Sequence, residues 1–70
     1  MKQIASMMAG VVVDVLVKPG DEVTDGTEVA ILESMKMQLP VQSDQTGKVK
    51  EIKVSQGDFV NEGDLLIVLE

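Results

Sequence analysis

The chain consists of two copies of one sequence pattern, and this internal repeat limits the folds it can adopt. Residues 10–33 read GVVVDVLVKPGDEVTDGTEVAILE, and residues 47–70 read GKVKEIKVSQGDFVNEGDLLIVLE. The two segments align without a gap, and all six glycines of the chain fall into three matched pairs within them. The repeat predicts two similar halves related by a quasi-two-fold axis, within one domain that covers residues 1–70.

Each half has the composition of short β-strands separated by tight turns. Valine, isoleucine and leucine dominate residues 11–17 and 48–54, and again residues 28–33 and 65–70. These residue types favour a pleated, half-buried surface, and the Gly-Asp dipeptides between the runs are typical of turns. No stretch has a sustained 3.6-residue apolar period, so helices are not expected. We predict an all-β fold, a flattened barrel or two-sheet sandwich in which one half covers the apolar face of the other.

Two finer features follow from the apolar positions that the halves share. In the first strand of each half, neighbouring apolar positions are three residues apart instead of two, which predicts a β-bulge near residues 13–14 and 50–51. Val23 and Val60 each stand alone between two glycine turns. We expect both valines to point into the core.

Composition argues against several classes of function. The chain has 70 residues and contains neither cysteine nor histidine, so it lacks a thiol nucleophile, the usual general base and the commonest metal ligand. An enzyme is therefore not expected. A formal charge of -6 and a single aromatic ring argue against nucleic-acid binding. Because no apolar run could span a membrane and no signal peptide is evident, we expect a cytoplasmic protein without membrane contact.

The repeat leaves residues 34–46, which read SMKMQLPVQSDQT, as the connection between the halves. Residues 38–42 alternate loosely and predict a further strand, in which Pro40 suits a sheet edge. Since the preceding strand ends near Glu33, the chain must reverse around residues 34–37. This reversal places Lys36 on a hairpin turn, at the end of the domain opposite both termini.

Lys36 is the candidate functional residue of this turn. A lysine in a turn is usually only a solvated side chain, and methionines often fill gaps in a core. Here, however, Met35 and Met37 flank the lysine at positions where an ordinary turn uses glycine, asparagine or aspartate. The apolar flanks and the isolated position between the halves mark Lys36 as more than a surface residue.

The segment Glu33-Ser34-Met35-Lys36-Met37 resembles the attachment motif of biotin carboxyl carrier proteins and biotinyl domains. In that family the motif is usually Ala-Met-Lys-Met, so the serine is a mild departure. The paired glycine turns also resemble this family and the related lipoyl domains, and the resemblance covers nearly the whole chain. The first strand departs further, because it lacks the two prolines that family members often carry.

The resemblance implies a carrier that is not itself a catalyst. Lys36 would be joined to biotin covalently, through an amide, and Met35 and Met37 would be recognised by biotin protein ligase. The carrier would move a carboxyl group between biotin carboxylase and carboxyltransferase sites. The acceptor stays open, since acetyl-CoA, propionyl-CoA, pyruvate and urea carboxylases, as well as decarboxylating sodium pumps, all use similar carriers. No metal is implied.

Two alternatives remain. The first is a lipoyl carrier domain of a 2-oxo acid dehydrogenase or a glycine-cleavage-like system, which shares the fold and the lysine. Lipoyl domains more often carry aspartate before the lysine and alanine after it, so Met35 and Met37 favour biotin. The second is a structural hairpin module, as in membrane-fusion adaptor proteins, in which no lysine is modified.

Overall fold

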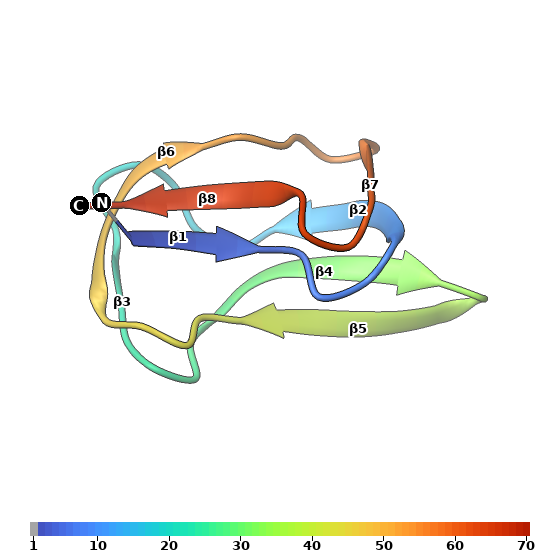
Figure 1. Cartoon of the computed structure of the whole chain (residues 1–70), viewed down its shortest axis with the longest axis horizontal. Helices are drawn as coiled ribbons and strands as arrows, with labels where there is room; N and C mark the ends of the chain where they lie inside the picture. The colour runs from blue at the N-terminus through green and yellow to red at the C-terminus, as the bar shows by residue number, and fades with distance from the viewer. Residues whose placement is uncertain (1) are drawn as a thin grey trace.

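A computed structural model describes residues 2–70, and within them all the regular structure is β-strand (Figure 1). The eight strands are β1 (Lys2–Ala5), β2 (Gly10–Val15), β3 (Glu22–Val23), β4 (Glu28–Ser34), β5 (Met37–Gln42), β6 (Gly47–Ile52), β7 (Phe59–Val60) and β8 (Leu65–Leu69). The predicted all-β fold is therefore confirmed. No helix in the described range is long and apolar enough to cross a bilayer.

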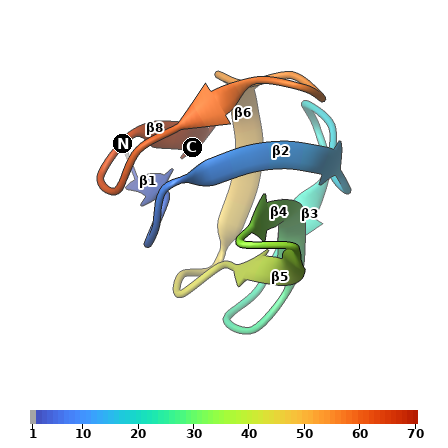
Figure 2. The ribbon, with the colours of Figure 1, turned by 90° about the vertical axis from the view of Figure 1, so that its right-hand side faces the viewer.

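The strands form two four-stranded antiparallel sheets that curl around a common core (Figure 2). One sheet has the order β1-β8-β6-β3 and the other has the order β5-β4-β2-β7. A shift of 37 residues maps β2 onto β6, β3 onto β7, β4 onto β8 and most of β5 back onto β1. Each sheet is thereby mapped onto the other strand by strand, as the predicted quasi-two-fold symmetry requires.

The halves are more interleaved than the sequence suggested. We expected one half to cover the apolar face of the other, but each sheet contains strands from both halves. The pair β2 and β4 is extended by β7 from the second repeat, and the pair β6 and β8 is extended by β3 from the first. The two halves thus exchange short edge strands, which ties each sheet to both copies of the repeat.

The predicted bulges are present at equivalent places in both sheets. The register shifts between Val12 and Asp14 where β2 pairs with β4, and between Val49 and Glu51 where β6 pairs with β8. An extra residue at each point bends the strand and increases its twist, which helps the two sheets to curl. Strands β2 and β6 end two residues earlier than predicted, although the side chains of Val17 and Val54 still pack against the core.

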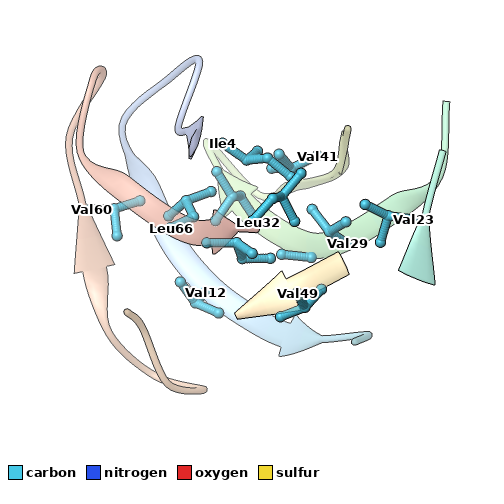
Figure 3. Close-up of a cluster of buried hydrophobic side chains, with 12 residues drawn as sticks. Ile4, Val12, Val23, Val29, Leu32, Val41, Val49, Val60 and Leu66 are labelled. Atoms are coloured by element: carbon cyan, nitrogen blue, oxygen red, sulfur yellow. The ribbon is translucent and has the colours of Figure 1, made fainter. Parts of the chain in front are cut away.

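The core is a single cluster of aliphatic side chains between the sheets (Figure 3). Leu32 and Leu66, on equivalent strands of the two halves, are fully buried. Val23 and Val60 lie at opposite ends of the cluster and are only 1% and 3% exposed. The prediction that these two valines close the core is confirmed.

Ser6 and Ser43 are a further matched pair, and they lie outside the repeat that the sequence made obvious. Both are buried, and each hydroxyl group donates to the carbonyl oxygen two residues later, of Met8 and Gln45 respectively. Each serine carbonyl accepts a hydrogen bond from the amide of a turn glycine in the other half: Gly63 donates to Ser6, and Gly26 donates to Ser43. The symmetry therefore extends upstream of Gly10, into the segment that joins the halves.

The molecule measures 32 × 19 × 18 Å, and its long axis separates two different ends. The start of β1 and the end of β8 lie together at one end, and the hairpin between β4 and β5 projects at the other (Figure 1). This arrangement leaves the hairpin clear of the rest of the fold.

Candidate functional site

The β4–β5 hairpin closes with a two-residue loop, and this loop consists of Met35 and Lys36. Six residue pairs join the two strands, from Glu28 opposite Gln42 to Ser34 opposite Met37. The predicted chain reversal around residues 34–37, with Lys36 on the turn, is confirmed. We call Met35 and Lys36 the hairpin tip.

The backbone at the hairpin tip adopts a conformation that L-residues seldom occupy. Met35 has φ = 52° and Lys36 has φ = 66°, and these are the only non-glycine residues with positive φ in the described chain. Positive φ at both central residues is the signature of a type I′ turn, which normally uses Asn-Gly or Asp-Gly. Each L-residue in this region costs roughly 1–2 kcal/mol. The long β4–β5 ladder holds the strained turn in place, as is common at functional sites.

The side chains of Met35 and Met37 lie in solvent. Met35 is 92% exposed and Met37 is 61% exposed, so neither methionine fills a gap in the core. Methionine is flexible and polarizable, and exposed methionines suit a surface that a partner protein must cover.

Lys36 is exposed, and within residues 2–70 its ammonium group has neither an ion-pair nor a hydrogen-bond partner. The hairpin that carries it projects from the body of the domain (Figure 1). An amine that is exposed at the end of a projecting two-stranded hairpin can enter the active site of another protein and be acylated there. The residues present therefore fit a covalently attached acyl group.

Glu33 and Gly10 support the base of this hairpin. The Glu33 side chain is exposed, whereas its main chain lies against Gly10 at the start of β2. A Cβ atom at position 10 would lie 2.7 Å from the Glu33 carbonyl oxygen, so only glycine fits there. Strand β2 can thus pair closely with β4 directly below the tip.

The described residues show no constellation for catalysis. No group of three or more His, Cys, Asp or Glu side chains within residues 2–70 could hold a metal ion. The cavity between the edge strands β1 and β5 is lined by apolar and amide side chains, and Asp44 is its only ionisable residue. It holds no nucleophile with a base beside it.

Sequence reasoning missed one surface feature beside the hairpin. Phe59 is 64% exposed and Val11, its partner across the β2–β7 ladder, is 38% exposed. The repeat contained the signal, because the residues aligned with Phe59 and Val11 are Glu22 and Lys48. A position that is charged in one half and apolar in the other is a surface position.

Comparison with known proteins agrees with the fold and with the motif at the tip. The family model described as "Biotin-requiring enzyme" matches residues 2–69. A biotin/lipoyl attachment protein of Bacillus subtilis (strain 168) is 54% identical over 66 residues, which make up 94% of this chain and 90% of that protein.

Larger carboxylases contain a similar segment. The mitochondrial propionyl-CoA carboxylase alpha chain of Homo sapiens is 52% identical over 65 residues, covering 93% of this chain but 9% of the carboxylase. The crystal structure of the Kluyveromyces lactis urea carboxylase matches with a TM-score of 0.90 and 33% identity, covering 99% of this chain and 6% of that one. The chain therefore spans nearly all of the attachment protein and less than a tenth of either carboxylase.

Proposed function

Because the chain belongs to the family of biotin-requiring enzymes, whose model spans residues 2–69, we propose that Lys36 is the residue that carries the cofactor. The cofactor of the family is covalent biotin, and the chain is a carrier and not a catalyst. The observation that supports Lys36 is its position: it is exposed at the tip of a two-stranded hairpin, between two exposed methionines, and has no partner within residues 2–70. Residues 1–70 act as one carrier domain.

Attachment requires a second protein, a biotin protein ligase. The Lys36 Nζ atom forms an amide bond with the carboxyl carbon of biotin. ATP drives the step: the carboxyl oxygen leaves with AMP, pyrophosphate is released, and the ammonium group gives up two protons to solvent and keeps the third as the amide N–H. The lysine charge is lost, so the formal total of -6 becomes -7. Met35 and Met37 are the side chains that the ligase reads on either side of the acceptor.

Once bound, biotin supplies a ring nitrogen that accepts and releases a carboxyl group, while the protein supplies presentation. The hairpin holds the arm at the end of the domain opposite the start of β1. Tethering keeps the cofactor at a high local concentration near the biotin carboxylase and carboxyltransferase sites between which the carrier moves. The carboxyl acceptor is a CoA thioester such as acetyl-CoA or propionyl-CoA, or pyruvate or urea, and the compartment is the cytoplasm.

Intact mass spectrometry after co-expression with a biotin protein ligase tests the assignment. Wild-type protein should gain the mass of one biotinyl group, and Lys36→Arg should gain none. Lys48→Arg is the matched control, because Lys48 is exposed on β6 in the other half, and it should be modified like the wild type. An unmodified wild-type chain, or equal modification of Lys36→Arg, would contradict the assignment.

The lipoyl alternative shares the fold and the acceptor lysine, and the name of the Bacillus subtilis relative includes both cofactors. The same experiment with a lipoate ligase separates the two. Biotin is favoured because both residues beside Lys36 are methionine. Preferential lipoylation of the wild-type chain would reverse this choice.

A further inference from the structure

Phe59 is the only aromatic residue of the chain, and it lies on the surface. Buried aromatic rings contribute some of the largest apolar areas in a protein core, roughly 150–250 Å² each. This small chain leaves its one ring 64% exposed, directly opposite Val11 on the outer face of the β5-β4-β2-β7 sheet. We call Val11 and Phe59 the Phe59 patch.

The second half of the chain serves as an internal comparison for the Phe59 patch. Glu22 and Lys48 occupy the equivalent positions, and they pair with each other across β3 and β6 as Phe59 and Val11 pair across β7 and β2. The same local fold thus forms with two charged residues at this place. Folding therefore does not require apolar residues at positions 11 and 59. The reason that Val11 and Phe59 are apolar lies in a contact outside the folded domain.

The Phe59 patch lies on the same end of the molecule as the hairpin tip. Val11 pairs with Glu33 in β4 on one side and with Phe59 in β7 on the other, and all three are exposed. Two strand spacings, about 10 Å, separate Phe59 from Glu33, and the tip lies two to three residues, roughly 7–10 Å, beyond Glu33 along the hairpin. Lys36 and Phe59 are therefore about 12–14 Å apart. A standard interface covers about 800 Å² on each partner, which corresponds to a disc about 16 Å in radius. A protein that sits over Lys36 therefore covers the Phe59 patch as well.

Acidic side chains surround the Phe59 patch. Glu33 neighbours Val11 on β4, Asp58 precedes Phe59, and Glu62 lies in the next turn, all of them exposed. An apolar centre with a charged rim is the usual anatomy of a protein interface. A surface that complements this one has an apolar pocket with lysine or arginine side chains around it.

We propose that the Phe59 patch is the docking surface for the enzyme that attaches biotin to Lys36; this inference rests on the proposed function. The unmodified lysine side chain is short, so this enzyme must close down on the hairpin tip itself. Later partners meet the lysine extended by biotin, so the reacting ring lies farther from the protein surface than the bare amine does. Of the partners in the cycle, the ligase is the one whose footprint must include Phe59.

The repeat supplies a well-matched test, since residues can be exchanged between equivalent positions. Val11→Lys/Phe59→Glu installs beside the tip the charged pair that the other half already accommodates. Glu22→Phe/Lys48→Val makes the reverse exchange at the far end. Steady-state biotinylation by a purified biotin protein ligase with ATP and biotin should show a fall in kcat/KM of at least tenfold for the first variant, mainly through KM. The second variant should behave like the wild type.

Several outcomes would overturn the proposal. Unchanged biotinylation kinetics for Val11→Lys/Phe59→Glu would contradict it. If only the carboxylation of the biotinylated variant were slowed, the patch would be a docking surface for the carboxylase instead. A wild-type dimer in sedimentation that this variant converts to monomer would assign the patch to a second copy of the chain. Phe59→Ser removes the ring without adding charge, and it should lower kcat/KM in the same direction. A wild-type chain that is not biotinylated at all would contradict the proposed function as well, which separates the two failures.

Discussion

The main chains of Gly10 and Glu33 lie so close together that no residue other than glycine fits at position 10. A Cβ atom on Gly10 would lie 2.7 Å from the Glu33 carbonyl oxygen, a backbone atom that cannot easily move. At the equivalent position in the other half, a Cβ atom on Gly47 would lie 3.3 Å from the Glu70 carbonyl oxygen and the same distance from the Leu69 Cβ atom. The strand packing is therefore tighter beneath the hairpin than at the opposite end.

This difference predicts unequal effects of alanine at the two glycines. Gly10→Ala should lower the free energy of unfolding by about 1–3 kcal/mol, the usual effect of overpacking, and Gly47→Ala should lower it by less. In a domain of this size, 1 kcal/mol corresponds to about 4–8 °C in Tm. Urea and thermal denaturation of both variants check the order. An equal or larger loss for Gly47→Ala would contradict the close contact at Gly10.

The two buried serines predict a matched pair of losses. The hydroxyl groups of Ser6 and Ser43 make the same hydrogen bond to a carbonyl oxygen two residues later, and both side chains are almost completely buried. Leaving a buried polar group unpaired costs about 1–3 kcal/mol. Ser6→Ala and Ser43→Ala should therefore each reduce stability by about this amount, as measured by urea denaturation. Ser55→Ala, at an exposed position, is the control and should change stability little.

Much of this structure could be predicted from the sequence because the same pattern of glycines and aliphatic residues occurs twice in the chain. The pairing of glycines and aliphatic residues predicted the strands, the bulges at both equivalent positions, and the burial of Val23 and Val60. The position of Lys36 on the reversal between β4 and β5 followed from the single break in the repeat. Each of these features depends on local pattern and turn chemistry, which a sequence displays directly.

Other features depend on contacts that a repeat does not specify. The exchange of β3 and β7 between the sheets pairs residues that are far apart in the chain. Two sequence repeats offset by 37 residues could form either two separate halves or two interleaved halves, so the repeat alone does not predict this exchange. The exposure of Met35 and Met37 was also ambiguous, since methionine is common in cores. The repeat did indicate that Phe59 lies on the surface, because its counterpart Glu22 is charged. This indication became clear only once the structure showed that the Phe59 side chain is exposed.

Met35 and Met37 offer a test of cofactor selection that leaves the fold intact. Both side chains are mostly in solvent, so Met35→Asp/Met37→Ala should change Tm by only a few degrees. If the methionines are what the ligase recognises, the variant should be biotinylated at least tenfold more slowly, a loss of about 1.4 kcal/mol in transition-state binding. Modification by a lipoate ligase should rise in parallel, as followed by intact mass. Unchanged biotinylation would show that recognition depends on the hairpin backbone instead.

The strained turn at the hairpin tip predicts that stability and function oppose each other at Met35. Asparagine tolerates positive φ far better than methionine, and it is favoured at this position of a type I′ turn. Met35→Asn should raise the free energy of unfolding by about 0.5–1 kcal/mol, or a few degrees in Tm, because it relieves strain at φ = 52°. Met7→Asn is the control: Met7 is also exposed but its φ is not positive, so that variant should gain nothing. Thermal denaturation and biotinylation kinetics, measured together, should show a more stable protein that is a poorer ligase substrate. A variant that gains stability and is modified at the wild-type rate would show that methionine is not kept at this position for recognition.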